Sequence, residues 1–145
     1  MSRDQIKYRE GYKYQLAEDY TIQISIYPIV EIETEFIRLD RDGYLLIRRG
    51  YAWDGPSGPT CDTVNSMRGS LVHDALYQLM RQGHLLPELR DEADVIAYKI
   101  WREDGMGAFR AALWKRELGK WAANAADPRS KKKVLVAPHN KYSKS

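Results

Sequence analysis

The spacing of apolar residues changes once along this chain, at a loop rich in glycine and proline that spans residues 51–60. Before the loop, apolar and polar residues alternate with the two-residue period of half-buried strands. After it, apolar residues recur in adjacent pairs every fourth position, which is typical of amphipathic helices. Because one pattern cannot serve both periods, the sheet is predicted to precede the helices. We therefore expect an α+β fold, an N-terminal antiparallel β-meander followed by about three packed helices.

The expected strands lie in the first third of the chain. Residues 21–26 and 30–36 each alternate without a break, and Pro28 separates them. Proline is found at strand ends and edges because it cannot donate to the ladder. Residues 44–47 are predicted to form the next strand, after a turn at residues 40–43 that ends in glycine.

Three helices are expected after the loop. The first is predicted to start at Asn65 or Ser66, which can cap it, and to end before Gly83. The second follows Pro87, and the third lies between Gly107 and the Asp127–Pro128 pair. The first turns of the second helix carry acidic residues, which the helix dipole favours: Glu88, Asp91, Glu92 and Asp94.

Positive charge is concentrated at the C-terminus. The whole chain carries +3, but residues 127–145 carry +5, so residues 1–126 carry −2. Residues 1–126 are predicted to form a single α+β domain and residues 127–145 a basic, extended tail without a packing pattern. We expect Lys131, Lys132 and Lys133 to contact a partner protein, and residues 134–136 to add a strand to a neighbour's sheet edge. A nucleic-acid partner is not indicated, because only the tail is basic.

The composition also bears on the compartment. Cys61 is the single cysteine, so an intrachain disulfide is excluded, which suits a reducing compartment. The first residues contain no apolar stretch of the kind found in signal peptides, and no apolar run is long enough to span a bilayer. We expect a protein that is made in the cytoplasm, that stays there or leaves by a route that reads no N-terminal signal, and that is not transmembrane.

The candidate chemistry lies on the first two helices. His73 and Tyr77 are four residues apart and share a helix face, with Asp74 about 100° round the helix from His73. A half-buried imidazole that is oriented by a carboxylate can take a proton from water near neutral pH. Because the connection between the two helices is short, they are predicted to pack antiparallel and to bring Asp94 to His73. Asp74 and Asp54, with carbonyl groups of the loop, are candidate oxygen ligands for a divalent cation, and calcium is the first choice.

The order of these motifs resembles the calcium-dependent phospholipases A2, above all the disulfide-free version carried in parvovirus capsids. The resemblance rests on the Tyr51 loop, the His73-Asp74-Ala75-Leu76-Tyr77 helix and the Ala93-Asp94 pair. It implies that His73 is the base, Asp94 the carboxylate that orients it, Tyr77 a hydrogen-bonding support and Asp74 a calcium ligand. It also implies a lipid or small ester substrate. Trp53 stands where the calcium loop of that family has a glycine.

A second resemblance covers about residues 11–125. Small tailed-phage and prophage proteins share N-terminal strands, a loop similar to residues 54–59, a His-Asp-x-Leu-Tyr helix like that at His73, and a following Ala-Asp pair. This resemblance implies a phage origin and other phage particle proteins as partners. Two functions stay open. One is a metal-assisted His/Asp ester hydrolase. The other is a non-catalytic particle component in which His73 is a structural hydrogen-bonding group and the tail binds a neighbouring subunit.

Overall fold

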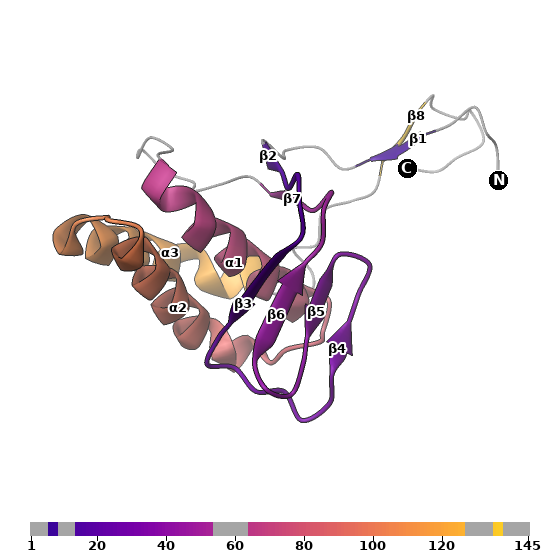
Figure 1. Cartoon of the computed structure of the whole chain (residues 1–145), viewed down its shortest axis with the longest axis horizontal. Helices are drawn as coiled ribbons and strands as arrows, with labels where there is room; N and C mark the ends of the chain where they lie inside the picture. Colours follow the sequence, from indigo (N-terminus) through magenta and orange to yellow (C-terminus); the bar gives the residue numbers. More distant parts are fainter. Residues whose placement is uncertain (1–5, 9–13, 54–63, 127–134, 138–145) are drawn as a thin grey trace.

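The computed structural model describes residues 6–8, 14–53, 64–126 and 135–137. Its strands and helices follow one another along the chain in the order shown in Figure 1. They are β1 (Ile6–Tyr8), β2 (Tyr14–Gln15), β3 (Tyr20–Gln23), β4 (Ile32–Glu33), β5 (Ile37–Leu39), β6 (Tyr44–Ile47), β7 (Ala52–Trp53), α1 (Val64–Arg81), the 3-10 helix η1 (Pro87–Leu89), α2 (Arg90–Glu103), α3 (Ala108–Ala126) and β8 (Leu135–Ala137). Antiparallel strands followed by three α-helices confirm the α+β fold class.

The main sheet has four antiparallel strands in the order β3-β6-β5-β4. Strands β4, β5 and β6 form a meander, but β3 lies beside β6 and not beside β4. This is the strand order of a Greek key, in which one strand returns by a longer connection to the far side of three consecutive ones. The antiparallel sheet was therefore predicted correctly, whereas a simple meander was the wrong order for its first strand.

The predicted strand at residues 30–36 is also wrong in its limits. The chain reverses at Thr34, whose backbone N–H donates to the Ile37 carbonyl at 2.8 Å, while the Thr34 hydroxyl accepts from the Ile37 N–H at 3.0 Å. A threonine hydroxyl that bonds the nearby backbone competes with strand pairing in this way. The predicted turn at residues 40–43 is confirmed, with Gly43 at φ 86° and Asp40 Oδ1 accepting from two backbone N–H groups.

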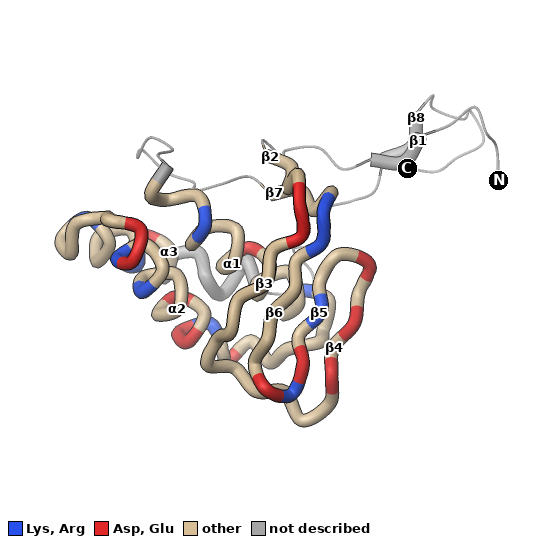
Figure 2. Tube along the Cα trace, in the orientation of Figure 1, with Lys and Arg blue, Asp and Glu red and all other residues tan. Residues whose placement is uncertain are grey.

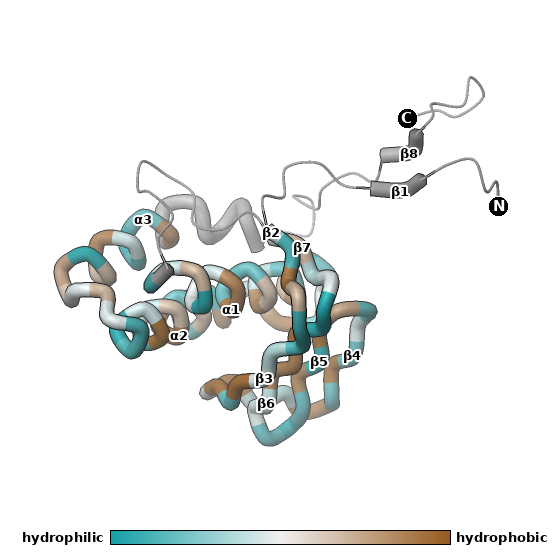
Figure 3. The backbone as a smooth tube through the Cα atoms, turned by 45° about the horizontal axis from the view of Figure 1, so that its top comes forward, coloured by the Kyte–Doolittle hydropathy of each residue, from teal (hydrophilic) through white to brown (hydrophobic). Residues whose placement is uncertain are grey.

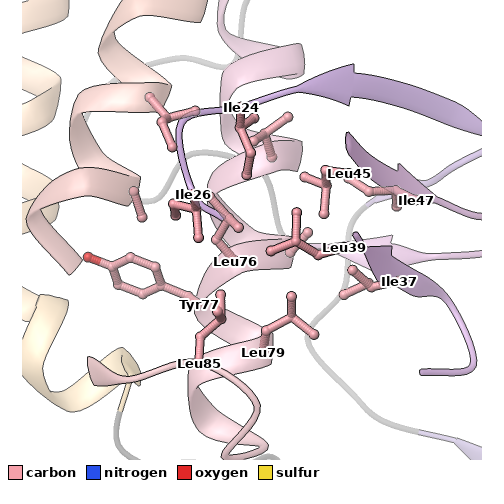
Figure 4. Close-up of a cluster of buried hydrophobic side chains, with 14 of the residues drawn as sticks. Ile24, Ile26, Ile37, Leu39, Leu45, Ile47, Leu76, Tyr77, Leu79 and Leu85 are labelled. Carbon is pink, nitrogen blue, oxygen red and sulfur yellow. The ribbon is translucent and has the colours of Figure 1, made fainter. Parts of the chain in front are cut away.

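The helices cover one face of the sheet, and the core lies between them (Figure 1). Apolar residues are spread along β5, β6 and α1 (Figure 3). Side chains of Leu39, Leu45 and Ile47 point from the strands toward Leu76 and Leu79 of α1 (Figure 4), and all five are fully buried. Burying a side chain of this size contributes about 1.5–3 kcal/mol, so this layer fixes α1 against the sheet.

Helix α1 ends at Arg81, before Gly83 as predicted. This glycine has φ 81°, and the N–H groups of Gly83 and His84 donate to the carbonyl groups of Met80 and Leu79, at 3.0 and 2.8 Å. This pair of bonds is the Schellman motif, which glycine favours because it has no Cβ to strain at positive φ. The short connection that follows lets α2 return along α1.

The C-terminal segment differs from the expectation in one respect. Strand β8 pairs antiparallel with β1 of the same chain, Tyr8 opposite Leu135, so within this chain the strand has an intramolecular partner. The two strands form a small ribbon away from the main sheet (Figure 1). In the part of the chain that the structure describes, no helix is long and apolar enough to cross a membrane.

Candidate functional site

Helices α1 and α2 pack closely enough to bring their polar residues together. Gly69 of α1 lies against the indole ring of Trp101, and the Trp101 Nε1–H donates to the Ser66 carbonyl at 3.0 Å. Any larger residue at position 69 would meet this ring. One and two turns of α1 further on, the same interface contains His73 and Tyr77, which face Asp94 in the first turns of α2.

His73 and Asp94 form a buried hydrogen-bonded pair. Nε2 of His73 lies 2.7 Å from Oδ1 of Asp94, and the two residues are 5% and 4% exposed. Because an ionised carboxylate can only accept, the imidazole donates from Nε2. In the neutral ring, Nδ1 then has no proton and can accept one. The sequence-based expectation that these two side chains lie within hydrogen-bonding distance is confirmed.

Tyr77 supports the same carboxylate. Its hydroxyl donates to Oδ1 of Asp94 at 2.8 Å, and its ring lies 4.0 Å from the imidazole ring, centroid to centroid. Figure 4 shows the ring of Tyr77 with its hydroxyl directed away from the apolar side chains of the sheet. Two donors on one oxygen fix the position of Asp94, and Asp94 in turn fixes the tautomer and the orientation of His73.

Asp74 lies on the other side of the imidazole. Its Oδ1 is 3.8 Å from Nδ1 of His73, which is too long for a hydrogen bond but close enough for charge attraction. The Asp74 side chain is 31% exposed, whereas that of His73 is 6% exposed. The Nδ1 edge of the ring therefore lies next to a carboxylate that solvent reaches.

The two carboxylates change the protonation of their neighbours. Burial alone would lower the pKa of His73, but Asp74 and Asp94 favour the charged ring more strongly, so its pKa lies above the ordinary value. Burial and the bond to Asp94 raise the pKa of Tyr77, so its hydroxyl stays protonated and remains a donor. The pKa of His73, the group that would accept a proton, is thus raised by two carboxylates, the buried Asp94 and the partly exposed Asp74.

The structure describes only some of the other residues that were predicted to belong to the site. Asp54 and the three lysines Lys131, Lys132 and Lys133 lie outside the described residues. In the described part of the chain, no group of three or more His, Cys, Asp or Glu side chains could hold a metal ion. The predicted loop began at Tyr51, but Ala52 and Trp53 form β7, which pairs with Tyr14 and Gln15 of β2. Within residues 51–53, the chain is therefore largely strand and not loop.

One polar cluster was not anticipated from the sequence. Arg68 of α1 binds Asp104 at 2.7 Å and Glu103 at 2.9 Å, and it donates to the hydroxyl of Tyr20 in β3 at 3.0 Å. These contacts raise the pKa of Arg68, above all the hydrogen bonds to Asp104. The cluster joins α1 to the end of α2 and to the sheet. Its members are far apart in sequence, and no local spacing connects them.

Comparisons with protein-family models, with curated proteins and with solved structures found no match for this chain. Function is therefore inferred from the geometry around His73.

Proposed function

We propose that this protein is an ester hydrolase in which His73 is the general base, oriented by Asp94 and Tyr77. The observation that carries the proposal is the 2.7 Å contact of His73 Nε2 with Asp94, which leaves Nδ1 free to accept a proton. A base of this kind needs a held tautomer and a nitrogen that can reach water. The raised pKa of His73 makes it a stronger base than free imidazole once it is deprotonated.

In the proposed reaction, a water molecule attacks the ester carbonyl carbon while Nδ1 of His73 takes one of its protons. The carbonyl oxygen becomes an oxyanion, and the C–O bond to the leaving alcohol breaks as the carbonyl re-forms. The proton on Nδ1 passes to the leaving oxygen, which restores neutral His73. Asp94 stabilises the imidazolium that exists between the two proton transfers.

Calcium is the proposed cofactor, bound by Asp74 with Asp54 and carbonyl groups of the adjoining loop. Hard cations of this kind prefer oxygen ligands, and the partly exposed Asp74 carboxylate is the described group that fits. When bound, the cation would polarise the ester carbonyl. Calorimetric titration of Ca²⁺ into the wild type and Asp74→Asn tests this. We expect a dissociation constant within the range of known calcium sites, roughly 10⁻⁹ to 10⁻³ M, and loss of calcium binding in the variant. Equal heats in both proteins would remove calcium from the proposal.

The setting we propose is a phage particle, with synthesis in the host cytoplasm and contacts to other particle proteins through the C-terminal segment. The sequence resemblance to small tailed-phage proteins supports this setting. A substrate of lipid or small-ester type is proposed from the resemblance to the capsid-borne phospholipases A2.

A second function is favoured by a specific observation. His73 is only 5% exposed, as a purely structural hydrogen-bonding residue would be. In this reading, His73, Asp94 and Tyr77 join α1 to α2 in a non-catalytic assembly component.

Hydrolysis by matched histidine variants separates the two functions. His73→Gln should lower the rate on a phospholipid vesicle or a short-chain model ester by about 10²- to 10⁴-fold, which is the range for loss of a general base. His84→Gln is the control, because His84 is exposed and lies in the turn after α1. Circular dichroism should show both variants folded. If a folded His73→Gln protein hydrolyses the ester as fast as the wild type, the assembly function stands alone.

A further inference from the structure

The sheet ends at β3, but the helix layer continues past it. In Figures 1 and 3, α2 and α3 extend beyond the β3 edge of the sheet. Among the strands that the structure describes, β3 pairs only with β6, so its other side is a sheet edge. The Ile24 N–H donates to the Gly43 carbonyl. Because every second residue of an antiparallel strand bonds the same neighbour, Tyr20 and Ile22 also form their backbone hydrogen bonds with β6. The backbone groups of Thr21 and Gln23 therefore point outward, away from the sheet.

A groove lies along this edge. It has a volume of about 300 Å³ and runs between β3 and α2. Its apolar lining comes from both elements, Ile22 and Ile24 from the strand side and Ile96 and Ile100 from the helix. Lys99 and Glu103 also line it, and it extends to Tyr27, whose neighbours Ile29 and Val30 are 88% and 74% exposed. An unpaired strand edge beside an apolar groove is the surface that β-strand addition uses.

The chain itself contains a strand that suits this edge. Leu135–Ala137 is extended, and within the described ranges it pairs only with the three residues of β1, away from the main sheet. An isolated two-stranded ribbon is marginally stable in water, so this strand gains by joining a larger sheet. Pro138 follows it directly, and proline ends pairing because it lacks an N–H. We propose that residues 131–137 of a second copy of this chain bind the groove as an antiparallel strand on the free edge of β3.

Charge at both ends of this edge suits a lysine-rich strand. The turn between β5 and β6, which carries Asp40, Arg41 and Asp42, lies near the Gln23 end of β3 (Figure 2), and Glu92 binds Ser25 beside it. At the Tyr20 end, Arg49 and Arg68 meet Glu18 and Asp19 together with the two acids that Arg68 binds, so acids are in excess there too. In the antiparallel direction, Lys131, Lys132 and Lys133, which precede Val134, come to the end beside Asp42 and Glu92. At the whole-molecule level, residues 127–145 carry +5 and the remaining residues −2, so the donor segment and the acceptor body attract each other.

The inference deepens the assembly role proposed above and does not depend on hydrolysis. Its test is the self-association of the full chain, measured by sedimentation equilibrium. We expect a wild-type dimer that weakens as salt is added, because the contact is partly electrostatic. Thr21→Pro removes an outward N–H without removing a bond to β6 and should raise the dimer dissociation constant about tenfold or more. Thr21→Val keeps the N–H and should associate like the wild type.

A mixing experiment tests which segment meets which surface. A variant with Lys131→Glu, Lys132→Glu and Lys133→Glu changes only the donor segment, so it is informative even if Thr21→Pro does not fold. Alone it should be monomeric, but mixed with folded Thr21→Pro, which keeps an intact donor, it should form a heterodimer. His73→Gln should dimerise normally, so loss of hydrolysis and loss of association are separate results. A wild type that stays monomeric, or a triple-lysine variant that still dimerises like the wild type, overturns the inference.

Discussion

At the scale of single residues, the site depends on one buried carboxylate with two donors. Asp94 is 4% exposed, and both His73 and Tyr77 bond the same oxygen. A buried charge is tolerated only where such bonds replace those to water. Removing either donor should therefore lower the free energy of unfolding, whether or not the site is catalytic.

Tyr77→Phe isolates the hydroxyl of this arrangement. We expect a loss of about 1.5–3 kcal/mol in the free energy of unfolding, because a hydrogen bond to a buried charged group is removed while the ring stays. Urea denaturation measures it. Tyr98→Phe is a control, because Tyr98 of α2 is partly buried against the apolar residues around Trp101 and Trp114. A change equal to that of the control would show that Asp94 does not depend on the Tyr77 hydroxyl.

The raised pKa of His73 gives a pH dependence with a definite sign. The folded state holds the proton more tightly than the unfolded state, in which the pKa is about 6.5. This contribution to stability is complete below that value and is lost as pH rises through the folded-state pKa. The urea midpoint of the wild type should fall over this interval, and the difference from His73→Gln should narrow. A difference that widens with rising pH would contradict the raised pKa.

Hydrolysis should show the opposite trend. His73 must be deprotonated to act as a base, so the rate should rise with pH through the raised pKa of His73. The rate–pH profile on a model ester measures this. A rate that is independent of pH above about 5 would argue against histidine as the base.

At the scale of elements, the site is positioned by the close approach of α1 and α2. Gly69 allows this approach, because a Cβ there would overlap the Trp101 indole, whose N–H is held by the Ser66 carbonyl. The ion pair of Arg68 with Asp104 lies next to this contact, at the same end of α2. The two helices are thus fixed together at the end of α2 that lies away from Asp94, about one turn of α1 before His73.

Gly69→Ala tests this packing. We expect a loss of about 1–3 kcal/mol in the free energy of unfolding, the usual cost of overpacking a well-packed interface. Gly107→Ala is the control, because nothing lies within 4 Å of a Cβ at that position. Thermal unfolding of both variants measures the difference. If Gly69→Ala is as stable as the control, the helices have room to separate, and the site is not fixed by this contact.

At the scale of the whole molecule, the four-stranded sheet with α1, α2 and α3 forms the body, and the β1–β8 ribbon stands apart from it (Figure 1). Removal of residues 128–145 takes away β8 and none of the core residues that are buried in the described part of the chain. We expect it to change the free energy of unfolding by less than about 1 kcal/mol, since an isolated ribbon contributes little. Denaturant unfolding of the truncated chain measures this. A truncated chain that does not fold would show that the ribbon is part of the body.

Local patterns in the sequence determined the element types, the end of α1 and the pairing of His73 with Asp94. Helical spacing puts His73 and Tyr77 on one face, and a short connection after Gly83 makes α2 return along it. These features depend on residues that are close in the sequence, so the spacing of apolar and polar residues is enough to predict them. The hairpin turn at Thr34 was missed because an alternating pattern does not show where a side-chain hydroxyl reverses the chain.

Tertiary structure alone decided the rest. The position of β3 beside β6 depends on which edge of a finished hairpin buries more apolar surface, and strand alternation does not encode it. Arg68 joins residues that are 35 or more positions away from it in the sequence, and β8 meets β1 across nearly the whole chain. Contacts at such separations form only when the body has folded, because the core between α1 and the sheet brings distant segments together. The groove beside β3 has the same origin: it lies between two elements that each satisfy their own local pattern.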